Sequence, residues 1–194
     1  DSVLFAAVAT ILPLLLTGGI HMDGFMDTID ALSSHRDREQ KLAILKDPHI
    51  GAFAAIYFGI YLLLSFGLYH ALFQPDSLLV VCIGFLLSRS LVVVSAVTLP
   101  RARKEGLLHT MTAQVPSKRV LFALSLVALL TAGAMVWVNH ASGGMAVALA
   151  LISLVGYRSM AKQQFGGVTG DTSGFFLQLC ELAILFGVWI GRLF

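Results

Sequence analysis

Three aspartates in one short segment are the residues of this chain best suited to chemistry. Asp23, Asp27 and Asp30 are separated by four and then three residues, so a helix would carry them on one face, about a turn apart. Like charges at this spacing repel one another, and no Lys or Arg occurs between Ser2 and His35 to compensate them. Carboxylate oxygens at this density suit Mg²⁺ or Mn²⁺. We therefore expect a divalent-metal site, with an acidic face at a membrane interface as the alternative.

Two further aspartates stand at places where a helix could begin. Asp47 precedes Pro48, a pairing typical of a helix start, so capping and a site role are equally good interpretations of Asp47. Asp171 lies in the glycine-rich stretch Phe165–Gly174, directly before a long apolar run. Such a loop can cradle a phosphate on its backbone amides, or it can be a plain connection with Asp171 as the helix cap.

Two charged residues fall inside apolar runs. Arg89 lies near the middle of one run and Glu181 within another. An ionisable group inside a membrane is costly and usually functional, although a structural ion pair is a serious alternative here. Arg101, Arg103 and Lys104 follow the run that holds Arg89 and are suited either to phosphate binding or to anchoring at the membrane surface. Carboxylates, loop amides and cations together indicate metal-assisted phosphoryl or nucleotidyl transfer.

The elements that must position these residues are membrane-spanning helices. Of the 194 residues, 57% are hydrophobic and 12% charged, and the mean hydropathy is +0.85. This composition excludes a disordered chain, a basic nucleic-acid-binding domain and most soluble enzymes. We expect an all-α polytopic membrane bundle formed by one domain over residues 1–194. About six stretches are long and apolar enough to span a bilayer: Val3–Ile20, Ile50–Phe73, Ser77–Leu99, Val120–Val138, Gly143–Tyr157 and Phe175–Phe194.

The charges lie almost entirely in alternate loops. Eleven of the 13 basic residues and eight of the 11 acidic residues fall in the segments Gly18–His49, Pro100–Arg119 and Arg158–Gly174. The two intervening loops carry no basic residue. By the positive-inside rule, the three charged segments face the cytoplasm. We expect a multi-pass protein of the inner (cytoplasmic) membrane with its catalytic loops on the cytoplasmic side. A polar amphipathic helix over Ser34–Lys46 is expected to lie at that interface.

Several motifs, in order along the whole chain, resemble the cobalamin synthase family, also called adenosylcobinamide-GDP ribazoletransferase. Thr17–Asp30, with the sequence TGGIHMDGFMDTID, is similar to the family signature GGxHxDGxxDTxDG, except that Ala31 replaces the usual glycine. The other matching segments are LAILKDPHIGAF at Leu42–Phe53, the pair Ser88-Arg89, ARKEGL at Ala102–Leu107, and GGVTGD at Gly166–Asp171 followed by Glu181. Family members begin with a further hydrophobic segment, so we expect the complete protein to have one upstream.

The resemblance implies a reaction and roles for individual residues. In this family an α-ribazole hydroxyl, or that of its 5′-phosphate, attacks the phosphate that adenosylcobinamide-GDP carries on cobinamide, and GMP leaves. The family depends on Mg²⁺, which implies that Asp23, Asp27 and Asp30 bind Mg²⁺, with Asp47 or Asp171 completing the site. Arg89 and Arg103 would neutralise phosphate charge, Asp30 would be the general base, and Asp27 and Asp171 would share the catalytic centre. The loop residues Gly166, Gly167, Thr169 and Gly170 would bind the phosphates.

Two other functions are compatible with a charged membrane bundle. A lipid-type CDP-alcohol phosphotransferase would need a DGxxAR element, but Asp23-Gly24 is followed by Phe25-Met26-Asp27 and no Ala-Arg. A transporter with Arg89 and Glu181 along its pathway would carry polar groups on both sides of the membrane or internal repeats, and the sequence has neither. We expect small-molecule substrates, contact with membrane lipid, a possible homo-oligomer, and no nucleic-acid partner.

Overall fold

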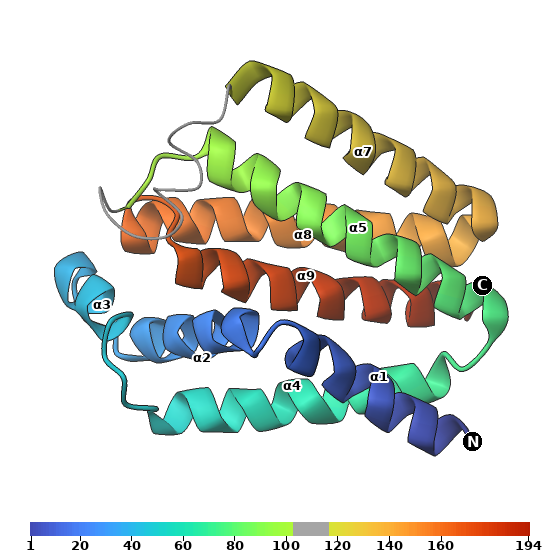
Figure 1. Cartoon of the computed structure of the whole chain (residues 1–194), viewed down its shortest axis with the longest axis horizontal. Helices are drawn as coiled ribbons and strands as arrows, with labels where there is room; N and C mark the ends of the chain where they lie inside the picture. The colour runs from blue at the N-terminus through green and yellow to red at the C-terminus, as the bar shows by residue number, and fades with distance from the viewer. Residues whose placement is uncertain (103–116) are drawn as a thin grey trace.

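The computed structural model describes residues 1–102 and 117–194, and these form helices joined by short connections (Figure 1). In chain order the helices are α1 (Ser2–Leu16), α2 (Ile20–Ser33), α3 (Arg38–Ile44), α4 (Ala52–Ala71), α5 (Pro75–Thr98), α7 (Ser117–Val138), α8 (His140–Met160), the π-helical turn η1 (Ala161–Phe165) and α9 (Gly170–Gly191). The described part of the chain contains no strand, which confirms the all-α prediction.

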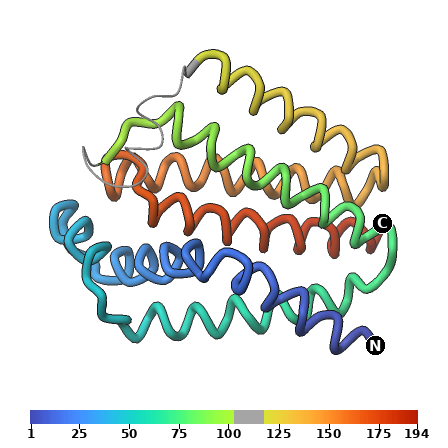
Figure 2. Tube along the Cα trace, viewed as in Figure 1, coloured from blue at the N-terminus to red at the C-terminus, as the bar shows by residue number. Residues whose placement is uncertain are grey.

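Helix α9 lies in the middle of the bundle. On one side it packs against α2 and α4, and on the other against α5 and α8 (Figures 1 and 2). Helix α7 lies outside α5 and α8, and α1 lies along α4. This arrangement buries α9 more than any other span, since 67% of its apolar window is buried inside the protein. Residues on α9 are therefore in reach of residues from both halves of the bundle.

Five helices, α4, α5, α7, α8 and α9, are long and apolar enough to cross a membrane. Helix α4, for example, has 20 residues, and this matches the roughly 30 Å hydrocarbon core. These five helices correspond to five of the six expected spans. The largest difference at a helix start is in α9, which begins at Gly170 instead of Phe175.

The first expected span, Val3–Ile20, is not one straight helix. Helix α1 ends at Leu16, and α2 sets off from Ile20 at 90° to it, so the two helices make at most one broken span. The break lies at Gly18 and Gly19, which both have positive φ (61° and 77°), a conformation that glycine adopts without strain. Pro13 lies within α1, not at the bend. The break is what directs the acidic helix α2 against α9.

Small residues allow α8 and α9 to approach closely. A Cβ on Gly187 would lie 2.4 Å from the Ala146 Cα, and one on Gly191 would lie 2.4 Å from the Ser142 Cα. Glycines four residues apart thus form the flat surface that membrane helices use for close packing. The contact fixes the C-terminal end of α9 against α8. It therefore also fixes the direction of the helix that carries the polar residues Asp171, Gln178 and Glu181.

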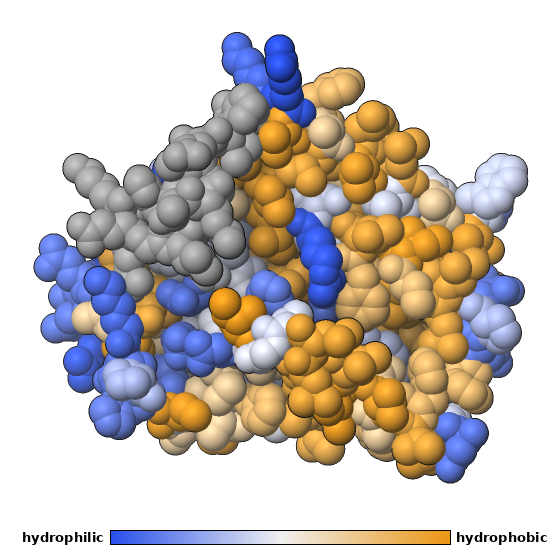
Figure 3. Space-filling view, in the orientation of Figure 1, coloured by the Kyte–Doolittle hydropathy of each residue, from blue (hydrophilic) through white to orange (hydrophobic). Residues whose placement is uncertain are grey.

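The polar segments meet at one end of the bundle. The connections around α3, the end of α5 and the loop between α8 and α9 all lie at the left in Figure 1. The surface in Figure 3 is hydrophilic at this end, over α3 and its neighbours. Hydrophobic side chains cover most of the rest of the visible face, which also shows a narrow hydrophilic strip near its middle and small hydrophilic areas at its edges. Arg101 pairs with Val168 as an isolated parallel bridge, which joins the end of α5 to the glycine-rich loop.

Candidate active site

The acidic helix α2 is held against the beginning of α9 by two glycines. A Cβ on Gly24 would lie 2.7 Å from the Asp171 carbonyl oxygen, and one on Gly174 would lie 2.9 Å from the His21 carbonyl oxygen. Each helix therefore presents a glycine to the backbone of the other. This contact places Asp171 beside the acidic face of α2, although about 140 residues separate them in the sequence.

The predicted metal ligands gather at this contact. The half-buried carboxylate of Asp27 is repelled by the carboxylates of four other residues: Asp23, Asp171, Asp30 and Asp47. Among the described residues, Asp27 makes no hydrogen bond that would compensate its charge. No three His, Cys, Asp or Glu side chains of the described residues converge closely enough to enclose a metal by themselves. The structure thus collects negative charge without a preformed protein cage.

Asp30 is engaged differently from Asp27. Its Oδ2 accepts a hydrogen bond from the Gly51 amide at 2.7 Å, and its Oδ1 accepts one from the Ala54 amide at 2.9 Å. Asp30 therefore caps the N-terminus of α4 from a neighbouring helix, where free amides and the helix dipole favour a carboxylate. A Cβ on Gly51 would lie 2.5 Å from either carboxylate oxygen, so a larger residue there would displace the Asp30 carboxylate.

Asp47 does not cap α4, and the helix-start interpretation of Asp47-Pro48 is wrong. The helix begins at Ala52 with Gly51 as its N-cap, because Asp30 supplies the acceptor there. Asp47 instead accepts hydrogen bonds from the His49 amide at 3.0 Å and pairs with His49 Nδ1 at 2.6 Å. These hydrogen bonds hold the pKa of the exposed Asp47 carboxyl below its ordinary value.

Most amides of the glycine-rich loop are already used within the protein. The Gly166 and Gly167 amides donate to the carbonyl oxygens of Lys162 and Ala161. The Thr169 amide donates to Thr172 Oγ1, as part of a capping box at the start of α9. Amide binding of phosphate by Gly166, Gly167 and Thr169 therefore does not agree with this conformation. Thr169, not Asp171, is the helix cap, and Gly170 remains exposed.

Helix α3 contributes cations that sequence reasoning had assigned to an interfacial helix. The Arg38 guanidinium lies directly on Gly166, where a Cβ would be 1.9 Å from its Cζ. Lys41 is buried, and its Nζ donates to Gln164 Oε1 in η1. The predicted helix over Ser34–Lys46 is shorter than expected, at seven residues, and it packs on η1. The sequence signal for this contact was the glycine at position 166, whose missing side chain leaves room for the Arg38 guanidinium.

Arg89 and Glu181 form an ion pair between α5 and α9. The Arg89 Nη1 donates to Glu181 Oε1 at 2.6 Å, and it also reaches the Ser88 hydroxyl and the Phe85 carbonyl oxygen. The sequence allowed either a structural ion pair or a functional charge inside the membrane. The structure shows the ion pair, and an ion pair is compatible with substrate binding by Arg89. Arg103, the other cation predicted to bind phosphate, lies outside the described residues.

The fold and its charged end define a multi-pass α-helical membrane protein with an acidic site where α2 meets α9. The family model for cobalamin-5-phosphate synthase matches residues 1–189. The chain therefore belongs to the cobalamin-5-phosphate synthase family, as its motifs had indicated.

Three curated relatives illustrate the similarity, and each is named adenosylcobinamide-GDP ribazoletransferase. The protein from Lachnoclostridium phytofermentans is 39% identical over 93% of this chain and 69% of its own length. Those from Pseudomonas fluorescens strain SBW25 and Desulfitobacterium hafniense are 35% and 36% identical over 95% of this chain, and 75% and 73% of their own lengths. No solved structure matches the chain.

Proposed function

We propose that this protein is an adenosylcobinamide-GDP ribazoletransferase. It would join α-ribazole, or α-ribazole 5′-phosphate, to adenosylcobinamide-GDP and release GMP, giving adenosylcobalamin or its 5′-phosphate. Membership of the family and the names of the relatives support this activity. The structural observation that carries the proposal is the contact of α2 with the start of α9, which adds Asp171 to the aspartates of the family-like motif.

Mg²⁺ is the cofactor that this acidic region suits best. Mg²⁺ is usually held by one or two carboxylates, with substrate phosphates and water completing its octahedral shell. That demand fits a site in which carboxylates are crowded but the described residues form no cage of three ligands. We assign Asp23 and Asp171 as the metal ligands, because they repel Asp27 most strongly and neither caps α4. When bound, Mg²⁺ would neutralise charge on the pyrophosphate and on the departing GMP.

The chemical step is a substitution at the phosphate attached to cobinamide. The ribazole hydroxyl oxygen forms a new bond to this phosphorus, while the bond from phosphorus to the bridging oxygen breaks. GMP leaves with the electron pair of that bond, and the hydroxyl proton passes to a protein carboxylate. We assign that carboxylate to Asp27 instead of Asp30. Two backbone amides occupy the carboxylate oxygens of Asp30, whereas Asp27 has no hydrogen-bond donor among the described residues and is open to accept a proton.

The charged end of the bundle is proposed to face the cytoplasm, where nucleotide substrates are available. The described parts of the three charged segments lie there, and positive charge favours the cytoplasmic side. The apolar flanks of α1, α4 and α7 would contact the lipid of the inner membrane. The same flanks could also join copies of the protein in a homo-oligomer. Arg89, on α5, would approach the pyrophosphate from that helix, and Arg103 keeps its proposed role in phosphate binding from the family-like motif alone.

The activity is tested with the protein purified in lipid nanodiscs and given adenosylcobinamide-GDP, α-ribazole or its 5′-phosphate, and Mg²⁺. We expect GMP and a cobalamin product in equal amounts, with both absent when EDTA replaces Mg²⁺. Folded protein that releases no GMP with either nucleoside substrate would overturn the proposal. GMP release that is undiminished in EDTA would remove the metal and leave the transferase assignment standing.

Orientation is tested by labelling single cysteines in closed membrane vesicles, after replacing the exposed native Cys82. Ser142 is a poor labelling site because it is buried against α9. Exposed His140 begins α8 and exposed Arg36 lies two residues before α3, and these two helix starts are at opposite ends of the bundle (Figure 1). We expect an impermeant maleimide to label His140→Cys from the periplasm and Arg36→Cys only from the cytoplasm. The reverse pattern would invert the orientation.

A further inference from the structure

We propose that Glu181 is a positioning residue, which holds the Arg89 guanidinium in the direction of α2 so that Arg89 can bind the pyrophosphate of the corrinoid substrate. The proposal rests on the transferase function above. The mechanism above assigns no role to Glu181. Under this proposal, Glu181 affects the reaction only through the position of Arg89.

The hydrogen bonds hold only one part of the guanidinium. A single nitrogen, Nη1, donates to Glu181 Oε1 at 2.6 Å, to the Phe85 carbonyl oxygen at 3.1 Å and to Ser88 Oγ at 3.3 Å. Among the described residues, no acceptor is bonded to Nη2 or Nε. The Arg89 Cζ also lies 5.3 Å from the centre of the Phe85 ring. The guanidinium is thus fixed along one edge, with its remaining donors unused.

The two partners differ sharply in exposure. The Glu181 side chain is 8% exposed, whereas the Arg89 side chain is 43% exposed. Removing an ion pair from water is expensive, and replacing such a pair with apolar residues often leaves stability unchanged or improved. Stability alone is therefore a poor reason for burying a carboxylate here. A buried acid that orients a half-exposed arginine is the arrangement expected of a binding group.

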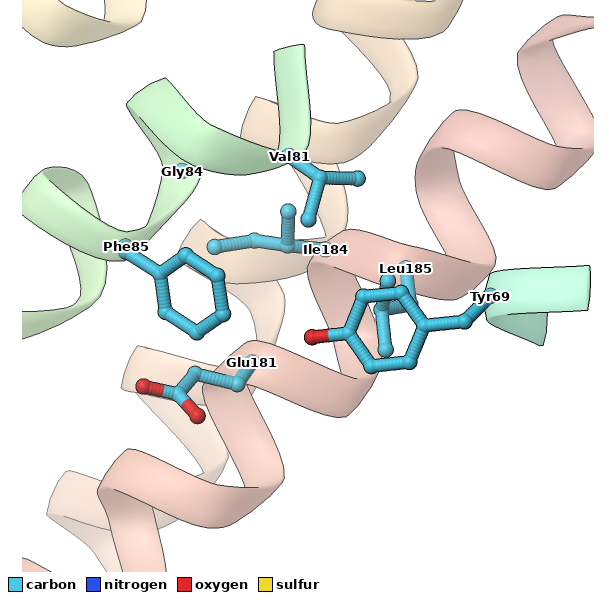
Figure 4. A pocket seen from close by; sticks show the side chains of 7 residues that line it. All are labelled: Tyr69, Val81, Gly84, Phe85, Glu181, Ile184 and Leu185. Carbon is cyan, nitrogen blue, oxygen red and sulfur yellow. The ribbon is translucent and has the colours of Figure 1, made fainter. Parts of the chain in front are cut away.

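The surroundings of Glu181 leave its carboxylate little freedom. Tyr69, Val81, Phe85, Ile184 and Leu185 line a small cavity beside it. Figure 4 shows the Glu181 carboxylate beneath the Phe85 ring, with the Tyr69 hydroxyl directed into the same space. A Cβ on the neighbouring Gly84 would lie 2.7 Å from an Ile184 methyl group, so α5 and α9 are in close contact here. Packing of this kind fixes the anchor for Arg89.

Arg89 lies within electrostatic reach of the beginning of the acidic helix. Along α9, Asp171 lies against Gly24 and Gly174 against His21, so α2 follows the same helix toward Glu181. The positive charge of Arg89 acts on His21, two residues before Asp23. Arg89 is therefore placed near the inner end of the carboxylate cluster, where a pyrophosphate bound through Mg²⁺ could accept its free donors.

A kinetic double-mutant cycle tests the proposal, with Arg89→Gln, Glu181→Gln and the combined variant. Glutamine keeps a hydrogen-bonding side chain at each position. Each single variant leaves the other charge of the pair without its partner, whereas the combined variant removes both charges. Ser90→Ala is the matched control, because Ser90 is buried beside Arg89 but its hydroxyl donates only to Leu86 of its own helix. The measurement is kcat/KM for adenosylcobinamide-GDP and for the α-ribazole substrate, together with the melting temperature of each variant.

We expect Arg89→Gln to lower kcat/KM for the corrinoid substrate about 100-fold, and Glu181→Gln to lower it about 10-fold. The combined variant should be no worse than Arg89→Gln, and KM for the α-ribazole substrate should stay unchanged throughout. Additive losses, or a loss for Glu181→Gln that follows its melting temperature, would overturn the positioning role. Undiminished kcat/KM in Glu181→Gln would do the same. Wild-type protein without GMP release would instead contradict the transferase function.

Discussion

Two groups of charged side chains lie along α9, and they are built on opposite principles. At the start of the helix, the carboxylates of Asp23, Asp171, Asp30 and Asp47 are crowded around Asp27 and repel it, and Asp27 makes no hydrogen bond to a described residue. Further along, Glu181 is paired with Arg89 at 2.6 Å and enclosed by apolar side chains. Crowded negative charge is what a site for a cation requires, while an ion pair fixes a side chain in place. The difference separates the residues that would react from those that position them.

A second contrast lies within the acidic helix itself. Asp27 and Asp30 are three residues apart on α2, yet Asp30 has an amide donor on each carboxylate oxygen and Asp27 has none in the described part of the chain. Sequence reasoning treated the three aspartates as equivalent ligands and selected Asp30 as the base. The structure gives Asp30 a structural duty that the spacing alone does not reveal.

The largest effect is expected from Asp27→Asn. An amide cannot accept the proton of the ribazole hydroxyl, so we expect kcat to fall by about 10³-fold or more. Helix α2 should keep its place, because Asp27 makes no hydrogen bond to the described residues. Rates of GMP release and the melting temperature are the measurements. Retention of more than a tenth of wild-type kcat would remove Asp27 from the reaction.

Substitution of the proposed metal ligands should change the metal requirement. In Asp23→Asn and Asp171→Asn we expect the Mg²⁺ concentration for half-maximal activity to rise about 10- to 100-fold, since one of two carboxylate ligands is lost. Excess Mg²⁺ should restore part of the rate. Glu39→Gln, an exposed carboxylate on α3, is the control for a general loss of negative charge. Equal shifts in the control would contradict the assignment.

Asp30 should matter for stability more than for chemistry. Loss of this inter-helix cap in Asp30→Ala is expected to destabilise the protein by about 1 kcal/mol, visible as a melting temperature lowered by a few degrees. Gly51→Ala should have a similar effect, because its new Cβ would meet the Asp30 carboxylate. We expect kcat to fall less than in Asp27→Asn. A complete loss of turnover in well-folded Asp30→Asn would restore Asp30 as the base.

The smallest effect is expected from Asp47→Asn. Its exposed carboxylate pairs only with the nearby His49, and its low pKa reflects that local pair. Because the folded-state pKa is lowered, the pair contributes at neutral pH and is lost as the pH falls through that pKa. Activity and melting temperature at pH 7 should stay close to wild type. A large rise in the Mg²⁺ requirement would instead make Asp47 a metal ligand.

The spans and the acidic helix were predictable because each depends on neighbouring residues. Runs of about 20 apolar residues define α4, α5, α7 and α8, and the spacing of Asp23, Asp27 and Asp30 gives a helical face. The break between α1 and α2 was not predicted, since a long apolar run hides a bend made by Gly18 and Gly19.

Contacts between distant segments could not be predicted from the sequence. The start of α4 depends on Asp30, which lies 21 residues before Gly51, and no local pattern marks that hydrogen bond. In the same way, the amides of Gly166 and Gly167 turn back to η1, and Arg38 covers Gly166 from α3. A glycine-rich sequence shows that the backbone can bend, but it does not show which partners the amides choose.

Direct binding of Mn²⁺, followed by electron paramagnetic resonance on the nanodisc protein with GMP present, tests the central contrast between the two charged groups. The account predicts one bound ion in wild type, in Glu181→Gln and in Asp27→Asn. It predicts that the ion is lost when Asp23→Asn and Asp171→Asn are combined. Mn²⁺ binding that survives in the combined variant, or that disappears in Glu181→Gln, would contradict the account.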